Sequence, residues 1–242
     1  MHNLEANLQR VRVDLAAAAA RAGRDPDSVQ LVAVTKTLPP ERVEQALAAG
    51  LTVFGESRLQ EARAKIPVIS SRARWHLIGH LQSNKARDAV SLFELIHSVD
   101  SVRLAVELNK WADRLGKTQA VLIEINVSGE ASKFGMKPED LESALRQLQA
   151  LPRLEVHGLM TIAPFAEDPE KARPSFRRLR ELRDAAAQQG WALPQLSMGM
   201  SHDFTVAIEE GATLIRVGTA LFGERSKTDE GLASRDEPSP AD

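Results

Sequence analysis

The stretch VQLVAVTKTLPPERVEQALAAG (29–50) contains one complete strand-then-helix unit. Its first part is a short apolar, β-branched run, which predicts a buried strand. Pro39 and Pro40 then predict the start of a helix and Gly50 its end, because proline suits the first helical turn and glycine the position after the last. A buried strand followed at once by a helix is the repeating unit of parallel α/β folds.

The same unit recurs along the chain. The apolar runs that predict strands are Leu31–Thr35, Thr52–Gly55, Trp75–Gly79, Leu95–Val99, Ala120–Val127, Leu154–Met160, Gln195–Met198 and Thr213–Val217. Eight such units in about 225 residues fit a closed barrel better than an open sheet, in which fewer strands are usual. An amphipathic stretch over residues 2–22 predicts one extra helix before the first strand. We therefore predict a single α/β domain, a (β/α)₈ TIM barrel over residues 1–225, followed by a disordered polar tail over 226–242.

Composition narrows the possible partners. The net charge of −2 is spread along the chain and shows no basic footprint, so we expect neither nucleic acid nor an anionic membrane as a partner. No apolar stretch has the length of a signal peptide core or a membrane span. The chain has no cysteine, which excludes disulfides and thiolate chemistry and suits a reducing compartment, and we expect a cytoplasmic location. His76 and His80 would not share a face in a strand and turn, so a zinc site is not expected.

Lys36 ends the first apolar run. An ammonium at the end of a buried strand is costly unless something uses it, and burial lowers the pKa of a lysine, which leaves its amine free to attack a carbonyl. The alternative is a lysine whose side chain extends from the strand end into solvent. Residues near the other end of the chain bear on this choice.

Two loops rich in small and hydroxyl residues follow the seventh and eighth runs. The first contains Met200 and Ser201 and leads into a helix predicted near His202; the second contains Gly218 and Thr219. TIM barrels often bind phosphate after strands seven and eight, through backbone amides and hydroxyls. The alternatives are that Ser201 is an ordinary helix cap and Gly218 an ordinary turn glycine.

Arg216 lies within the eighth apolar run and shares strand parity with Leu214 and Gly218. A buried guanidinium needs an acceptor, which is either a ligand or a glutamate of a neighbouring strand. A lysine amine, a phosphate cradle and a partner for a ring nitrogen together describe a site for pyridoxal 5′-phosphate (PLP) held as a Schiff base. Other polar residues after strands, which either face the barrel mouth or cap helices, are Glu56, Asn84, Lys85 and Asn126.

Motifs across nearly the whole chain carry a family resemblance. They are VAVTK (32–36), FGESRLQE (54–61), WHLIGHLQSNK (75–85), IHSVD (96–100), INVSGEASKFG (125–135), GLM (158–160), LSMGMSHDF (196–204) and IRVGTALFGER (215–225). In these segments the chain resembles the pyridoxal phosphate homeostasis protein family, which is similar to the N-terminal barrel of alanine racemase. Two positions depart from the common pattern: Ser57 stands where asparagine is frequent, and Thr205 where glutamate often follows.

The resemblance implies PLP as the cofactor, with Lys36 forming the Schiff base. It further implies that Arg216 lies near the pyridine nitrogen. The residues that the resemblance and their position after strands assign to the rest of the cofactor site are Ser201, Gly218, Thr219, Met200, Ser57 and Asn126.

Three functions fit these residues. The preferred one is a monomeric PLP-binding protein that acts in vitamin B6 and amino-acid homeostasis without robust catalysis, with apo forms of PLP enzymes as candidate recipients. The second is an amino-acid racemase, which in this fold uses a tyrosine from a second domain, whereas this chain has no tyrosine. The third is a cofactor-free lyase in which Lys36 attacks a substrate carbonyl directly.

Overall fold

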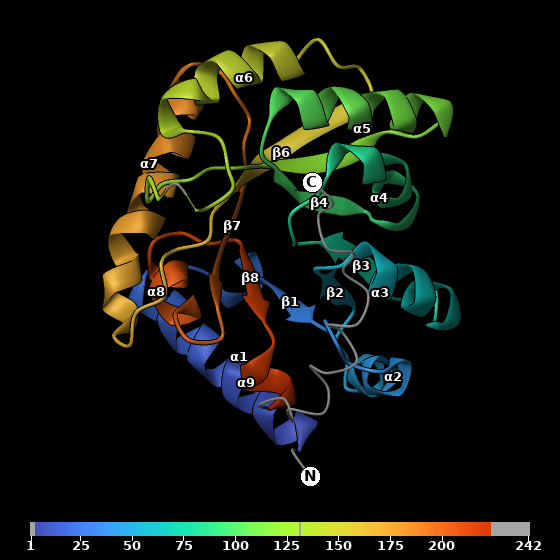
Figure 1. The fold of residues 1–242 in the computed structure, drawn as a ribbon. Coiled ribbons are helices and arrows are strands. Elements are labelled where there is room, and N and C mark those ends of the chain that lie inside the picture. Colours follow the sequence, from blue (N-terminus) through green and yellow to red (C-terminus); the bar gives the residue numbers. More distant parts are fainter. Residues whose placement is uncertain (1–2, 131, 224–242) are drawn as a thin grey trace.

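The computed structural model describes residues 3–130 and 132–223, and its strands form the predicted closed barrel (Figure 1). The eight strands pair in parallel in chain order, and the last pairs with the first. They are β1 (Gln30–Val34), β2 (Val53–Glu56), β3 (Arg74–Leu77), β4 (Leu95–Val99), β5 (Gln119–Glu124), β6 (Leu154–Met160), β7 (Gln195–Met200) and β8 (Leu214–Val217). Each predicted strand is present, and the bounds of β4 and β6 coincide with the predicted ones. The predicted tail lies outside the described residues.

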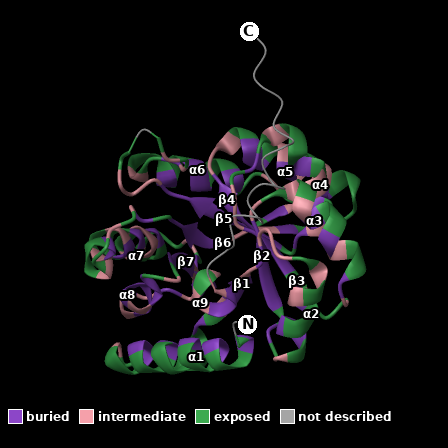
Figure 2. Ribbon diagram, turned by 60° about the horizontal axis from the view of Figure 1, so that its bottom comes forward, coloured by how far each residue is buried: buried purple, intermediate pink, exposed green. Residues whose placement is uncertain are grey.

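Helices surround the barrel, with their apolar sides buried against it and their outer sides exposed (Figure 2). They are α1 (Leu4–Arg21), α2 (Pro40–Ala48), α3 (Leu59–Lys65), α4 (Ala86–Leu92), α5 (Val102–Arg114), α6 (Leu141–Leu148), α7 (Arg173–Gln188), α8 (Phe204–Glu209) and α9 (Thr219–Phe222). The predicted proline start and glycine end of α2 are confirmed, since Pro40 opens the helix and Gly50 has a φ of 88°.

Alternate residues of each strand face two different apolar layers. The inner layer fills the barrel with Val32, Val53, Leu95, Leu122, Met160 and Leu214. The residues between them, such as Ala33, Phe54 and Ile215, pack in the larger core beneath the helices. Because side chains alternate along a strand, Arg216 lies on the inner face with Leu214.

The extra N-terminal helix, α1, packs along α8 and α9 (Figure 1). Its buried apolar face includes Leu8, Val11 and Leu15. Asn7 on the same helix donates a hydrogen bond of 2.8 Å to the carbonyl of Leu221 in α9. α1 therefore supports the segment that follows β8, where part of the predicted site lies.

Three arginines of α7 bind a carboxylate at the end of the neighbouring helix. Arg173, Arg177 and Arg180 all pair with Glu210 at the end of α8, at 3.0–3.1 Å. Glu210 is buried, and a buried carboxylate requires such partners. These ion pairs join α7 to α8 on the outside of the barrel.

Candidate functional site

Lys36 lies two residues beyond the end of β1, half-buried at the C-terminal end of the barrel. Val32, four residues earlier, belongs to the inner apolar layer. Because side chains alternate along a strand, the positions of Val34 and Lys36 are on that same inner face. Thr35 points the other way, and its hydroxyl donates to Glu56 Oε1 at 2.7 Å. Lys36 and Thr35 are thus directed to opposite sides of the barrel wall.

The turn after Lys36 is held in an uncommon backbone conformation. Thr37 has a φ of 64°, the only positive φ of a non-glycine residue within 3–130 and 132–223. Its N–H donates to Glu61 Oε2 at 2.6 Å, and its hydroxyl donates to the carbonyl of Lys36 at 2.6 Å. A β-branched residue in this region is strained, and such strain is typical of functional sites. These bonds fix the direction in which the chain leaves Lys36.

Glu56 does not face the barrel mouth, contrary to one interpretation of the sequence. It is fully buried in the layer beneath the helices and pairs with Lys65 Nζ at 2.6 Å. The same ammonium donates to the carbonyl of Thr35 at 2.8 Å. Burial raises the pKa of Glu56, and the charge and hydrogen bond of Lys65 oppose that effect. The pair braces the strand end that carries Lys36.

The loops after β7 and β8 meet at Ser201. Its hydroxyl accepts hydrogen bonds from the backbone N–H groups of Gly218 at 3.1 Å and Ala220 at 3.3 Å. Ser201 is not the cap of α8, because that helix begins at Phe204 and Asp203 occupies its cap position; its hydroxyl instead accepts from amides at the start of α9. The helix predicted near His202 therefore starts two residues later. Two amides and a hydroxyl oxygen are gathered at one point, beside the exposed Thr219.

This point lies next to the end of β1. Strands β1 and β8 pair with Val32 opposite Arg216 and Ala33 opposite Val217, so the chain beyond β8 continues beside Val34 and Lys36. A Cβ atom on Gly218 would lie 3.4 Å from Cβ of Val34, which confirms the close approach. The strand register therefore places the loops of Ser201 and Gly218 beside the end of β1, from which Lys36 follows.

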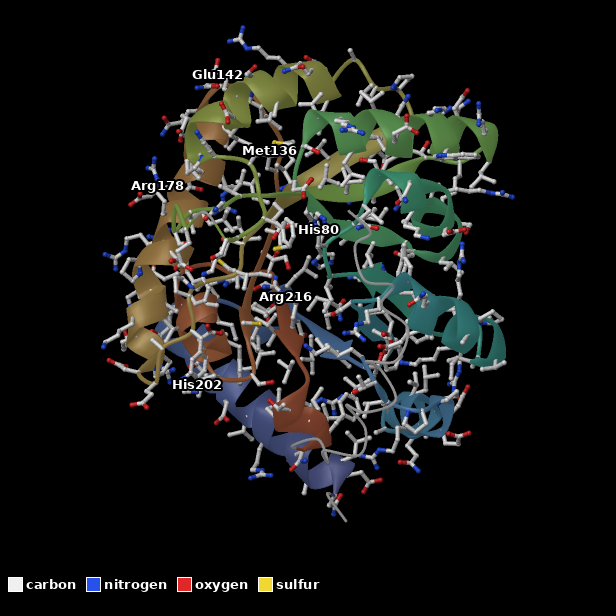
Figure 3. The ribbon with its side chains drawn as sticks, in the orientation of Figure 1. His80, Met136, Glu142, Arg178, His202 and Arg216 are labelled. Carbon is white, nitrogen blue, oxygen red and sulfur yellow. The ribbon has the colours of Figure 1, made fainter. Side chains whose placement is uncertain are left out.

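Arg216 lies at the centre of the ring of strands (Figure 3) and is 4% exposed. It donates from Nη1 to Ser197 Oγ at 2.5 Å and from Nη2 to the carbonyl of Thr161 at 2.9 Å. Burial lowers the pKa of Arg216 to about 10, although the charges of Glu124 and Asp203 oppose this, so it remains a cation at neutral pH. Its hydrogen-bond acceptors are a hydroxyl and a carbonyl, not the carboxylate of the alternative interpretation.

Glu124, at the end of β5, was not singled out from the sequence. Burial raises its pKa to about 7; the charge of Asp100 adds to this, and that of Arg216 opposes it. A carboxyl group that titrates near neutrality inside a barrel can hold or release a proton there. The alternation of side chains along the strand could have shown that Glu124 faces the barrel interior, because it lies two residues after Leu122 of the inner layer.

His76, His97 and Ser197 were also missed as a group. His97 Nδ1 lies 2.8 Å from Ser197 Oγ, and His97 Nε2 lies 3.0 Å from His76 Nδ1. With Arg216 they form a continuous row of polar side chains inside the barrel. Each of the three is a polar residue at a strand position that faces the barrel interior, which the sequence could have shown. That they contact one another depends on the tertiary structure.

The remaining predicted residues lie around this centre. Met200 is 37% exposed, and Ser57 is half-buried, with its backbone packed so closely against Gly79 that a Cβ there would lie 2.2 Å from the Ser57 carbonyl oxygen. The side chain of Asn126 holds its own loop: Nδ2 donates to the carbonyls of Glu130 and Lys133, and Oδ1 accepts from the N–H of Gly129. A contact of these three residues with a cofactor stays a prediction. Asn84 and Lys85 are exposed.

Two further classes of site were searched for in the part of the chain that the structure describes. There, no three or more histidine or acidic side chains group as metal ligands would. None of the helices in 3–130 and 132–223 has both the length and the apolar character needed to cross a bilayer.

Comparison with known proteins agrees with this geometry. Residues 6–226 match the family model described as alanine racemase, N-terminal domain. A protein of Aquifex aeolicus named pyridoxal phosphate homeostasis protein is 48% identical over 220 residues, which cover 90% of this chain and 96% of that protein. One of Pseudomonas aeruginosa with the same name is 42% identical over 226 residues, covering 93% and 97%. The chain belongs to the pyridoxal phosphate homeostasis protein family.

Solved structures extend the comparison. PipY of Synechococcus elongatus, solved without PLP, is 40% identical with a TM-score of 0.82, and the match covers 91% of this chain and all of that one. The structure of PipY with PLP bound is 39% identical with a TM-score of 0.80, over the same shares of the two chains. An alanine racemase of Clostridium difficile is only 16% identical, with a TM-score of 0.73, and covers 95% of this chain and 58% of its own. That likeness shows the shared barrel fold.

Proposed function

We propose that this chain binds PLP as a Schiff base on Lys36 and acts in the homeostasis of PLP and amino acids without robust turnover. The observation that carries the proposal is the meeting of Ser201 with the amides of Gly218 and Ala220 beside the end of β1. Both amides point their N–H groups at an oxygen atom here, and a phosphate oxygen would take the place of Ser201 Oγ, whose hydroxyl could then donate to the phosphate as well. The PLP-bound PipY structure supports the choice of cofactor.

The residues present fit each part of the cofactor. PLP supplies an aldehyde that condenses with an amine and a ring that withdraws electrons. Lys36 is the amine at the C-terminal end of the barrel, where barrel enzymes place reactive groups. Ser201, Gly218 and Thr219 would hold the phosphate, and Arg216 would face the ring nitrogen. Arg216 has only donors, so it would leave that nitrogen without a proton and weaken the ring as an electron sink.

That effect of Arg216 supports a binding role over fast catalysis. Racemisation through two bases needs an acid or base on each face of the substrate, and the chain contains neither tyrosine nor cysteine to serve as the second. The names of the relatives also describe homeostasis. We further propose that the protein acts as a monomer in the cytoplasm and passes PLP to apo enzymes.

Replacing Lys36 tests the covalent part of the proposal. Lys36→Ala should remove the absorbance of the Schiff base and the borohydride-fixed mass of PLP, while the circular dichroism spectrum stays that of the parent. Lys85→Ala, at an exposed lysine, should keep both signals. A PLP adduct of unchanged yield in Lys36→Ala would show that another amine carries the cofactor.

Turnover is tested separately. The PLP-loaded protein should not racemise, decarboxylate or transaminate L- or D-amino acids over many cycles in deuterated water, as followed by chiral chromatography and mass spectrometry. Multiple turnovers that disappear in Lys36→Ala would replace the homeostasis proposal with that of a racemase-like enzyme.

A further inference from the structure

A cavity of about 340 Å³ lies at the end of the barrel where the strands begin, opposite the mouth that carries Lys36. Its walls include Gln30, Arg74, His76, Glu94, Gln195 and Leu214, near the beginnings of different strands. Its volume falls in the range of small-molecule sites. No part of the proposed PLP site contributes to it.

The row of polar side chains inside the barrel ends at this cavity, and one direction of its hydrogen bonds gives every proton between two of its members an acceptor. The Arg216 guanidinium has only donors, so Ser197 Oγ must accept from it. The hydroxyl proton of Ser197 is then free to point to His97 Nδ1, 2.8 Å away. His97 is fully buried, and burial, together with the charges of His76 and Arg216, holds its pKa well below the usual value. A neutral His97 that accepts at Nδ1 carries its proton on Nε2.

The same argument passes to the next ring. With His97 protonated on Nε2, this N–H faces His76 Nδ1, 3.0 Å away, and His76 Nδ1 is the acceptor. Burial lowers the pKa of His76 to about 4, so this ring is also neutral and carries its proton on Nε2. Each donor in the row has one acceptor, and the direction runs from Arg216 to His76.

At the cavity wall two groups lack partners. His76 is 4% exposed, and within the described chain no group lies in hydrogen-bonding distance of its Nε2. The Oε1 atom of Gln195 is buried and also has no donor among these residues. Arg74 and Glu94 at the wall neutralise each other in a bidentate pair at 2.5 and 2.8 Å, and Asp27 adds a carboxylate at the rim. The cavity wall therefore presents two polar atoms, His76 Nε2 and Gln195 Oε1, that have no partner among the described residues.

We propose that this cavity is a second small-molecule site that takes an uncharged, hydroxyl-bearing molecule, whose oxygen accepts from His76 Nε2–H and whose proton goes to Gln195 Oε1. A hydroxyl group both accepts and donates, so it satisfies the two groups at once. A carboxylate has no proton to donate and would meet Glu94, and an ammonium cannot accept from His76. The site stands apart from the PLP proposal, because none of these contacts involves the cofactor.

The polarity of the row is measured first, in the full chain without any ligand. With ¹⁵N-labelled histidine at neutral pH, nuclear magnetic resonance should show His76 and His97 both protonated at Nε2 and not at Nδ1. A proton on Nδ1 of His76 would make its Nε2 an acceptor and would overturn the proposal. The result does not depend on PLP binding.

The ligand class is tested with three probes of one size: propanol, propionate and propylammonium. Propanol should shift the methyl signals of Leu95 and Leu214, which line the cavity, in a saturable way. Propionate and propylammonium should bind at least about tenfold more weakly, the difference expected for one hydrogen bond to a buried partner. No saturable shift, or a preference for a charged probe, would overturn the proposal.

Variants then assign the contacts. His76→Phe keeps a ring but removes the donor, and it should weaken propanol binding at least about tenfold. His157→Gln, at the partly exposed rim of the same cavity, should leave it unchanged. Gln195→Met removes the acceptor without touching the buried row, and it should cause a similar loss even if His76→Phe proves unfolded. Parental binding by Gln195→Met or a folded His76→Phe would overturn the proposal.

Discussion

Glu56 and Lys65 form a buried ion pair directly behind the strand end that carries Lys36. Both side chains are almost inaccessible to solvent, and Glu56 Oε2 has no hydrogen-bond partner among the described residues. Removing two charges from water is expensive, and their attraction repays the cost only while both are present. The benefit of the pair is local order, because Lys65 also holds the carbonyl of Thr35.

Lys65→Met should therefore lower the free energy of unfolding by about 3–5 kcal/mol, since it leaves a buried carboxylate without a counter-charge. Urea unfolding at neutral pH measures the change. The double variant Glu56→Leu with Lys65→Met should recover most of the loss, because no isolated charge remains. A single variant within about 1 kcal/mol of the parent would show that water reaches Glu56.

The two loops after β7 and β8 act as one element, joined through the hydroxyl of Ser201. Under the proposed function, Ser201→Ala should reduce PLP affinity by about tenfold to a hundredfold, the value of one hydrogen bond to a charged group. Equilibrium dialysis of PLP against the variant measures the effect. Ser128→Ala, in the loop after β5, is the matched control and should bind as the parent does. Equal affinity in all three proteins would place the phosphate elsewhere.

Gly158 of β6 packs directly against the backbone of Gln195 in β7. A Cβ atom there would lie 1.9 Å from the carbonyl oxygen of Gln195, so any side chain would push the two strands apart. Gly158→Ala should reduce the free energy of unfolding by about 3 kcal/mol or more, at the upper end of overpacking costs.

Gly116→Ala is the control for Gly158→Ala. Gly116 has a φ of 65° with open space around its Cβ position, so its substitution should cost only about 1–2 kcal/mol of backbone strain. Chemical unfolding of both variants measures the two losses of free energy of unfolding: that from the steric clash in Gly158→Ala and that from the strained backbone in Gly116→Ala. Similar losses would mean that β6 and β7 separate easily.

The whole molecule should show an unusual dependence of stability on pH between about 4 and 7. The pKa of Glu124 is raised from 4.5 to about 7, so the folded state binds more protons than the unfolded state in that window, and this term falls as pH rises. The pKa of His76 is lowered from 6.5 to about 4, so its contribution has the opposite sign and grows with pH between these values. The two terms partly cancel in the parent.

Glu124→Gln removes the falling term. The free energy of unfolding of this variant relative to the parent should therefore rise by up to about 3 kcal/mol between pH 4.5 and pH 7, the equivalent of the full pKa shift. Urea titrations at several pH values measure the difference. Parallel curves for the two proteins would show that Glu124 ionises normally in the folded chain.

Local features of the sequence were enough to predict the barrel. These features are apolar β-branched runs, prolines at helix starts and the glycine at position 50. Each acts over a few neighbouring residues, so it can be interpreted without knowledge of the tertiary structure. Position within a strand-then-helix repeat also selects Lys36, Arg216, Ser201 and Gly218 as candidate site residues, because parallel strands bring their C-terminal ends to one side. Family motifs then connected these residues to PLP.

Only the tertiary structure decided which polar residues meet inside the barrel wall. Glu56 lies at a strand end like the site residues, but its side chain faces the helices, where Lys65 supplies the opposite charge. His97 meets His76 from 21 residues away and Ser197 from 100 residues away. Strand pairing and barrel closure set these contacts, and the sequence spacing of the residues does not contain them.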